Sequence, residues 1–507
     1  MITIKPTSQN LWDIVAESYI FFVNESLDSE SDNANFTKIQ EYYPQVKAVL
    51  KKHNFEGKQG QSYILTAMQN DRLVEFIFVG LGKHTKSWDV ELEKLRRAIG
   101  NVTLLLKKHG LRSAAIGLPE EKPYNISRAE LLKQLIVTMH MANYEFNVYK
   151  TKEPKKDWQC DVSFVVDASE EKALAASANH GMIMGEAINQ ARHWADLPAN
   201  IMTPTALADE AEKIAKQYKL KCTIFGRDEA EKLGMGAFLA VDAGSDQPGK
   251  FVILEHKAAS KDAQTIALLG KGVMFDTGGI SLKQSDFMTG MKYDMSGAAA
   301  VIASMKIFAQ LNPDINVVGI TPLVENMPSG KAARQDDIVT AMNGKSIEIK
   351  STDAEGRLIL SDAMCYAEKF HKPDIMIDIA TLTGACLYAL GYFYSGLMTQ
   401  DEELMKVLPE IGKKTGDRIW PLPLDDDFKA ANNSLVADLA NVGCRSYKAG
   451  TITAGCFLSE FVDKARWAHI DIAGTADGVP GNISYLGKTS AGAGIRLLVD
   501  FVLNFKH

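Results

Sequence analysis

The chain has 507 residues, which is enough for about three domains of typical size or for two larger ones. Hydrophobic residues make up 46% of it and charged residues 23%, which excludes a chain that is disordered throughout and provides for a large core. The formal net charge of −7 disfavours a general nucleic-acid binder, although it leaves a local basic patch open.

The sequence has no features of a secreted or membrane-bound protein. Its six cysteines include no Cys-x-x-Cys pair, which is typical of buried thiols in a reducing compartment. The N-terminal residues lack a basic segment followed by an apolar core, so no signal peptide is expected. The longest uncharged stretch, 379–400, contains threonines, tyrosines and glycines, which favours a buried strand, turn and helix over a membrane span. We therefore predict a cytoplasmic protein that does not enter a membrane.

The N-terminal part of the chain alternates between short apolar runs and a helical segment. Strands are predicted over 62–66, 73–79 and 114–118. A helix is predicted over 90–109, where apolar residues recur at helical spacing. This alternation indicates a layered α/β domain, and it contains no motif with evident chemistry.

A long helix is predicted between two domains. Residues 170–194 have helical composition without proline, and Pro198 ends the segment. We therefore divide the chain into an N-terminal α/β domain, a connecting helix and a larger C-terminal domain, with limits at 1–170, 171–197 and 198–507.

The C-terminal domain has longer and more apolar strand candidates, with helices between them. Near-continuous apolar runs are typical of strands buried on both faces, so an α/β fold with a mixed, mainly parallel sheet flanked by helices is predicted. Ligands of such sheets bind at the carboxyl ends of the strands. The predicted strands are 251–254, 265–269, 315–320, 375–380 and 468–472, and the helices include 297–311 and 358–370.

Two glycine-containing turns, each predicted between a strand and a helix, carry charged residues. The first spans 270–283 and continues to Asp294, where a helix begins, and the second spans 351–358. If these turns meet, four carboxylates converge with two lysines and an arginine. The residues are Lys271, Asp276, Lys283, Asp294, Asp353, Glu355 and Arg357.

Crowded carboxylates repel each other and need cations between them. Oxygen ligands suit divalent ions, and two ions about 3.5–4 Å apart are common in hydrolases. None of the ten histidines lies in either turn, which disfavours a histidine-ligated zinc protease. Each residue alone has a plainer interpretation as a helix cap or a solvated charge. Spacing alone therefore leaves several two-metal hydrolases open.

The octapeptide 351–358 is similar to the signature of the leucyl aminopeptidases, the family of cytosol aminopeptidase and bacterial aminopeptidase A known as peptidase family M17. The first turn and Asp294 match the same family in order and spacing, as do the segments 197–200, 380–385 and 467–474. The match covers about 180–507, and the N-terminal part resembles the family only in length and layout. The resemblance implies a metal-dependent aminopeptidase that removes N-terminal residues from peptides, with leucine and other apolar residues preferred.

The resemblance also implies roles for individual residues. Two divalent ions, Mn²⁺ or Zn²⁺ with Co²⁺ or Mg²⁺ as alternatives, are expected on Lys271, Asp276, Asp294, Asp353 and Glu355, with Asp276 and Glu355 bridging them. A metal-bridging hydroxide would attack the peptide carbonyl. Lys283 would polarise that carbonyl, and Arg357 would hold a bicarbonate ion that acts as general base. The expected substrate-binding residues are Lys283, Met291, Thr381, Leu382 and Gly384.

Three positions depart from the family pattern, and three rival interpretations stay open. Ser351 replaces the usual Asn, Ser296 the usual Gly, and Thr277 the usual Ser, so no ligand is lost but rate and preference can change. The rivals are a catalytically idle homologue, a two-metal phosphatase or nuclease, and DNA binding as in some bacterial relatives. Family precedent also implies a homohexamer.

Overall fold

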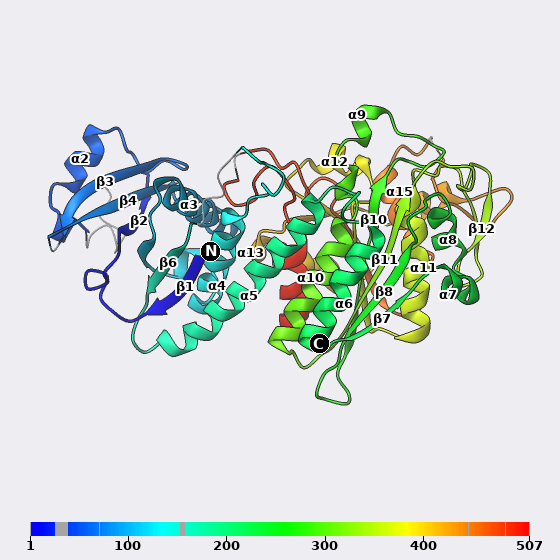
Figure 1. Ribbon diagram of the computed structural model, residues 1–507, viewed down its shortest axis with the longest axis horizontal. Helices are drawn as coiled ribbons and strands as arrows, with labels where there is room; N and C mark the ends of the chain where they lie inside the picture. Colours follow the sequence, from blue (N-terminus) through cyan, green and yellow to red (C-terminus); the bar gives the residue numbers. More distant parts are fainter. Residues whose placement is uncertain are drawn as a thin grey trace. The chain divides into compact units, whose positions relative to one another are not determined.

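The computed structural model describes residues 2–25, 39–69, 71–152, 158–444, 446–481 and 483–505 (Figure 1). They form two compact units, Met1–Asn189 with Gly481–Gly487, and Gln190–Pro480 with Lys488–His507. The boundary between the two units, after Asn189, lies within helix α5 (Glu171–Asp196). The domain limits derived from the sequence stay predictions, because a compact unit need not fold by itself.

The first unit is built on a six-stranded sheet in the order β1-β6-β5-β2-β4-β3. All neighbouring strands are parallel except β3 and β4, which form an antiparallel pair. The predicted strands are confirmed as β3, β4 and β5, whereas β1, β2 and β6 are additional. The bounds are β1 (Ile2–Thr7), β2 (Ser18–Asn24), β3 (Ser62–Gln69), β4 (Arg72–Gly82), β5 (Ser113–Gly117) and β6 (Cys160–Val165).

Apolar side chains cover both faces of this sheet. Along β2, Ile20 and Phe22 pack with one core cluster, while Tyr19 and Phe21 pack with the other. The first cluster includes the buried stripe of the predicted helix, now α3 (Trp88–His109), together with α4 (Arg128–Asn143). The second includes α2 (Val46–Lys52). Alternation along the strand therefore places helices on both faces.

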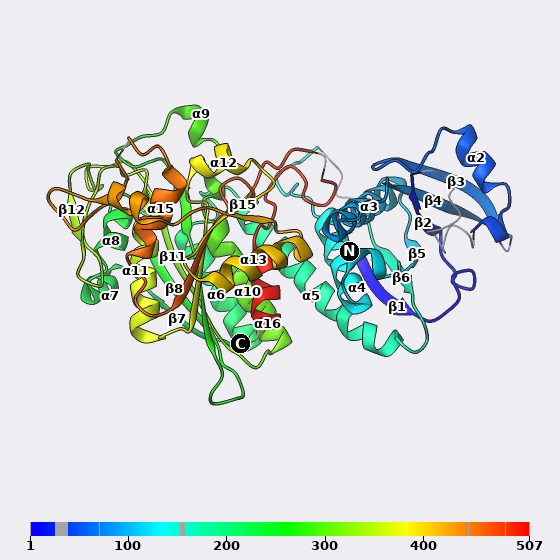
Figure 2. The same ribbon diagram turned by 180° about the vertical axis from the view of Figure 1, so that it is seen from behind.

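The second unit contains a nine-stranded sheet in the order β16-β15-β18-β14-β9-β11-β8-β7, with β10 paired to β11 (Figure 2). Strands β18, β14, β9, β11 and β10 are mutually parallel, whereas β8 runs against β11 and β15 against β18. The mixed, mainly parallel sheet is confirmed. The bounds are β7 (Lys221–Phe225), β8 (Lys250–His256), β9 (Thr265–Gly270), β10 (Gly272–Asp276), β11 (Asn316–Asn326), β14 (Ile375–Ala380), β15 (Ser395–Met398), β16 (Ile419–Pro421) and β18 (Arg466–Asp471).

Helices cover both faces of the large sheet. One layer contains α6 (Pro204–Tyr218), α10 (Ser296–Leu311), α13 (Glu402–Thr415) and α16 (Ile495–Asn504). The other contains α7 (Arg227–Leu233), α8 (Gly236–Asp242), α11 (Glu355–Phe370) and α15 (Gly450–Ser459). Shorter elements complete the unit: α9 (Ser285–Met288), α12 (Gly384–Leu390), α14 (Asp426–Lys429) and a small sheet of β12 (Ile338–Thr340), β13 (Ser346–Glu348) and β17 (Leu439–Ala440).

The uncharged stretch 379–400 folds as the end of β14, helix α12 and strand β15, so it contains one strand more than expected. Among the residues that the structure describes, no helix combines the length and apolar character that a membrane span requires.

The ends of the parallel strands define where a site can form. Lys271 follows β9, Asp276 ends β10 and Asn326 ends β11. Thr381 follows β14, and Asp471 ends β18. Because carboxyl ends of neighbouring parallel strands lie at one edge of a sheet, these five residues come from segments far apart in sequence to the same edge.

A pH-dependent contribution to stability is expected at the start of α13. Asp401 Oδ1 accepts hydrogen bonds from Glu403 N at 3.0 Å and Leu404 N at 2.9 Å, and its Oδ2 lies 2.6 Å from Arg466 Nε. The Arg466 guanidinium lowers the pKa of Asp401 to about 2, below its ordinary value of 3.8. The pKa of Asp401 is therefore lower in the folded than in the unfolded chain. Its ionised form stabilises the folded state above pH ~4, and this stabilisation is lost as the pH falls towards ~2. Asp401→Ala should therefore lower the free energy of unfolding by roughly 1–2 kcal/mol at pH 7 and by much less near pH 2.

Urea unfolding at several pH values measures this difference. Asp425→Ala serves as the control for the loss of a helix cap alone. Asp425 caps the four-residue α14 and accepts a hydrogen bond from Asp427 N at 2.9 Å. A loss for Asp401→Ala that stays constant from pH 7 to pH 2 would show that the ion pair does not supply it.

Candidate metal centre

The backbone around Lys271 is fixed between strand β14 and the start of α10. Lys271 N donates to Ile379 O at 3.1 Å, and Lys271 O accepts from Ala298 N at 2.8 Å. A Cβ on Gly270 would lie 2.4 Å from Gly297 O, and one on Gly297 would lie 2.2 Å from Ile379 O. The glycines therefore allow the close backbone approach that buries Lys271.

Lys271 lies buried between two carboxylates. Its Nζ is 2.8 Å from Asp294 Oδ1, 2.8 Å from Glu355 Oε1 and 2.9 Å from Thr381 O. Burial disfavours the ammonium form, but the charges of Asp294 and Glu355 outweigh it and raise the pKa of Lys271. The first and second charged turns are thus joined through this lysine.

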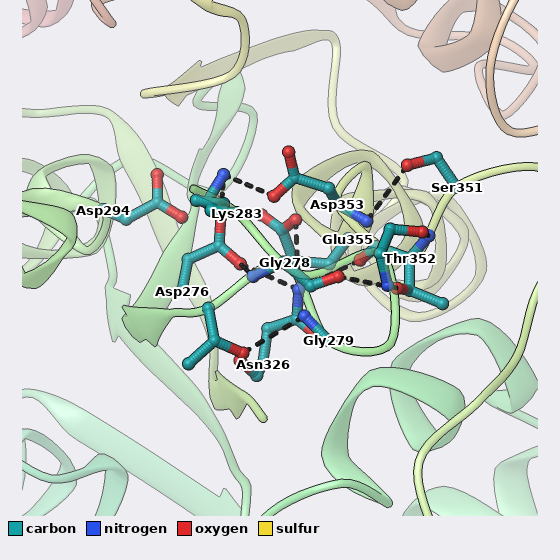
Figure 3. Close-up of polar contacts among 12 residues, drawn as sticks. Asp276, Gly278, Gly279, Lys283, Asp294, Asn326, Ser351, Thr352, Asp353 and Glu355 are labelled. Carbon is teal, nitrogen blue, oxygen red and sulfur yellow. Dashed lines mark hydrogen bonds and ion pairs between the residues drawn. The ribbon is translucent and has the colours of Figure 1, made fainter. Parts of the chain in front are cut away.

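Lys283 joins the same two turns at a second point (Figure 3). Gly278 and Gly279 adopt φ values of +85° and +64°, so the chain reverses after Asp276 and returns as Lys283. Lys283 Nζ lies 2.8 Å from Asp276 Oδ2 and also forms an ion pair with Asp353. Although burial opposes it, the nearby carboxylates raise the pKa of Lys283.

Asp276, Asp353 and Glu355 form a group able to hold a cation (Figure 3). One oxygen of each lies within 4.8 Å of the others. Burial, followed by repulsion from Glu355, raises the pKa of both Asp276 and Asp353 above their ordinary values. Asp294 lies beyond Lys271, and its buried Oδ2 has no hydrogen-bond partner. Oxygen donors of this kind, in a buried site with an unpartnered carboxylate oxygen, fit divalent ions.

Asn326 connects the carboxylates of both turns and was not among the residues predicted from the sequence. Its Nδ2 donates to Asp276 Oδ1 at 2.8 Å, to Thr352 O at 2.9 Å and to Glu355 Oε2 at 3.4 Å. Its position at the carboxyl end of β11 could have indicated a site residue, but the strand was predicted only over 315–320 and therefore ended before Asn326. Asn326 therefore orients two of the three clustered acids.

Arg357 is the third residue of α11, and its side chain contacts none of the clustered carboxylates in the hydrogen bonds described below. Its Nη1 donates to Asn441 O at 2.7 Å, while its buried Nε has no partner. Burial lowers the pKa of Arg357 to about 10. The side chain therefore remains cationic at neutral pH and retains an N–H group for an anion.

The residues expected to bind substrate lie on segments next to the cluster. Thr381 Oγ1 donates to Asp294 Oδ1 at 2.7 Å, and Leu382 N donates to Asp471 Oδ1 at 3.1 Å. Met291 begins the short 3₁₀ helix η2 (Met291–Tyr293), and its carbonyl accepts from Asp294 N at 3.3 Å. Gly384 is exposed at the first turn of α12. Besides Lys283, which pairs with Asp276 and Asp353, Thr381 is thus the expected substrate-binding residue whose side chain contacts one of the predicted metal ligands in these hydrogen bonds.

Two of the departures from the family pattern have a structural explanation. Thr277 Oγ1 donates to Asn326 O at 2.7 Å and accepts from Gly279 N at 3.2 Å, contacts that a serine hydroxyl also allows. Ser296 Oγ donates to Tyr293 O at 2.6 Å and so stabilises the turn before α10. The third departure, Ser351, accepts a hydrogen bond from Asp353 N at 3.3 Å.

Comparisons with known proteins identify the family of the chain. The model of the cytosol aminopeptidase family, catalytic domain, matches residues 189–499, and that of its N-terminal domain matches 20–153. A probable cytosol aminopeptidase of Nitrosococcus oceani is 40% identical over 461 residues, 90% of each chain. The cytosol aminopeptidase of a Pseudomonas aeruginosa strain is 41% identical over 432 residues, which is 85% of this chain and 86% of that protein.

A solved structure titled "Bottromycin maturation enzyme BotP in complex with Mn" is also similar, with a TM-score of 0.83 and 27% identity. The match covers 96% of this chain and 98% of that one. The chain belongs to the cytosol aminopeptidase family, peptidase family M17. The likeness includes the N-terminal region, where the sequence motifs alone indicated only a similar layout.

Proposed function

We propose that this protein is a metal-dependent aminopeptidase that releases N-terminal residues from peptides, with leucine and other apolar residues preferred. The observation that carries the proposal is the buried cluster in which Lys271 and Lys283 join carboxylates from both charged turns. Membership of the cytosol aminopeptidase family supports the same reaction.

The residues that would hold two divalent ions are Lys271, Asp276, Asp294, Asp353 and Glu355, and Asp276 and Glu355 would be shared between the ions. Mn²⁺ is the first candidate, because the similar solved structure is titled as a complex with Mn, and Zn²⁺, Co²⁺ and Mg²⁺ are alternatives. Such ions make a hydroxide available near neutral pH and stabilise negative charge. Lys271 can act as a ligand only when neutral, so its ion pairs with Asp294 and Glu355 imply proton release on metal binding.

The chain's own cations would complete the site. Lys283 polarises the scissile carbonyl, because an ammonium beside the forming oxyanion stabilises it more in the transition state than in the substrate. Arg357 holds a bicarbonate ion as general base, since its planar fork suits a carbonate-like anion and its Nε is unpartnered. Met291, Thr381, Leu382 and Gly384 line the path of the substrate.

Wider properties of the protein are also part of the proposal. Family likeness suggests a homohexamer in the cytoplasm that acts on peptide substrates. Nucleic acid is not an expected partner, given the net charge of −7.

The test is hydrolysis of Leu-p-nitroanilide by metal-stripped enzyme, with Mn²⁺, Zn²⁺, Co²⁺ and Mg²⁺ restored one at a time. We expect activity to disappear on stripping and to return with Mn²⁺ or Zn²⁺ most strongly. Glu-p-nitroanilide tests side-chain preference. A p-nitrophenyl phosphate monoester tests the rival phosphatase, and a p-nitrophenyl phosphate diester tests the rival nuclease. Failure of every ion to support hydrolysis of any of these substrates would favour an idle homologue, and hydrolysis of a phosphate ester alone would favour the other rival.

A further inference from the structure

We propose that Asn441 is a positioning residue for the metal centre. It holds the loop that carries Asp353 and leads into Glu355 at the start of α11, and it also holds the guanidinium of Arg357. This inference rests on the proposed function, and it assigns a role to a segment outside both charged turns.

The side chain of Asn441 forms hydrogen bonds with the backbone of the loop before α11, which has no regular secondary structure. Its Oδ1 accepts from Lys350 N at 2.8 Å and from Ser351 N at 3.3 Å. Its Nδ2 donates to Ser351 O at 2.7 Å and to Ala354 O at 3.4 Å. Asn441 is 0% exposed, so water does not replace these contacts. One amide therefore contacts the loop on either side of Asp353.

The backbone of Asn441 connects two further parts of the site. Asn441 N donates to Glu348 O at 3.0 Å, which extends the parallel pairing of β17 with β13. Asn441 O accepts from Arg357 Nη1 at 2.7 Å. Asn441 thus connects the loop before α11 and Arg357 with the small sheet that contains β13 and β17.

The position of the loop matters because it carries Asp353 and joins it to Glu355, the first residue of α11. Its course therefore sets the separation of two carboxylates that would hold cations. Residues 349–354 are neither helix nor strand, so hydrogen bonds within an element do not fix their course. Groups that orient metal ligands typically change metal affinity by about 10- to 100-fold when they are removed. Asn441 acts indirectly, by positioning the backbone that carries the carboxylates. We do not expect it to contact substrate or metal.

The experiment compares full-length, metal-stripped wild-type protein with Asn441→Ala and Asn441→Asp. Asn441→Asp keeps the side-chain volume and both acceptor contacts but removes the donor to Ser351 O and Ala354 O. Mn²⁺ affinity is measured by calorimetry, thermal unfolding without metal reports stability, and kcat and KM are measured at saturating Mn²⁺. We expect Mn²⁺ to bind about 10- to 100-fold more weakly to both variants. At saturating Mn²⁺ we also expect a lower kcat. Without the side-chain hydrogen bonds the backbone at position 441 can shift, and its carbonyl oxygen, which accepts from Arg357 Nη1, would shift with it.

Asn432→Ala is the matched control. Asn432 is also buried, at 2% exposure, and its Nδ2 donates to Ala440 O at 3.4 Å, on the neighbouring residue of the same segment. Because it does not contact the loop, this variant should keep wild-type Mn²⁺ affinity even if its melting temperature falls. If the role of Asn441 were purely structural, the Asn441 variants would behave like Asn432→Ala. Their melting temperature would fall, but their Mn²⁺ affinity would stay at the wild-type value.

The outcomes separate this inference from the proposed function. If wild-type protein neither binds Mn²⁺ nor hydrolyses peptides, the proposed function fails. If wild type does both and a folded Asn441 variant binds Mn²⁺ equally well, only the positioning role is wrong. If both variants fail to fold, Asn441 supports the fold as a whole, and the local role is likewise wrong.

Discussion

Replacing Glu355 by glutamine is expected to lower kcat/KM for a leucyl substrate by about 10³-fold while the chain stays folded. Glu355 is 2% exposed, and it contacts Lys271 Nζ at 2.8 Å and Asn326 Nδ2 at 3.4 Å. Glutamine fills the same volume but removes the charge that would hold a cation between the two turns. Metal affinity should therefore fall together with turnover.

The measurement is steady-state hydrolysis of Leu-p-nitroanilide over a range of Mn²⁺ concentrations, together with Mn²⁺ binding. Glu348→Gln is a matched control, because Glu348 is a buried glutamate nearby whose carboxylate pairs with Lys350 and accepts from Ser434 Oγ at 2.6 Å. Its turnover should stay within about 3-fold of wild type, since the substitution leaves the cluster charges unchanged. Wild-type turnover in a folded Glu355→Gln variant would contradict the assignment of Glu355 as a metal ligand.

Much of the fold follows from hydrophobic pattern, because strands buried on both faces read as continuous apolar runs. The prediction was incomplete where a residue broke that pattern. Pro322 interrupts the apolar run of β11, yet the strand continues to Asn326 and pairs Pro322 with Phe251 of β8. Strand β10 (Gly272–Asp276) was treated as part of a turn, because it is short and begins with glycine.

The charged part of the site was predicted more completely than the neutral part. Carboxylates and lysines crowded into two turns are visible in the sequence, and direct contacts now connect Lys271 and Lys283 with acids from both turns. Asn326 and Asn441 were missed because a neutral amide acquires its role only from partners far away in the chain. Only the three-dimensional structure locates such contacts.

Gly356→Ala should lower turnover by about 10²-fold with little change in thermal stability. Gly356 is the second residue of α11, a position where alanine usually favours a helix by roughly 0.5–1 kcal/mol over glycine. Here a Cβ would lie 2.4 Å from Lys271 Cε and 2.8 Å from Lys271 Nζ. The flexible lysine can move, so the fold survives. Movement nevertheless separates Nζ from Asp294, Glu355 and Thr381 O, which hold it in the cluster.

A double-mutant cycle tests whether Lys271 transmits this effect. Gly356→Ala should weaken Mn²⁺ binding when Lys271 is present and add little in a Lys271→Ala background, where the colliding atoms are gone. Gly330→Ala is the control, because a Cβ there would meet no atom within 4 Å. Equal, additive losses in both backgrounds would mean that the methyl group acts on α11 itself. The cycle would then remove the main steric argument that Lys271 must occupy its observed place for the centre to bind metal.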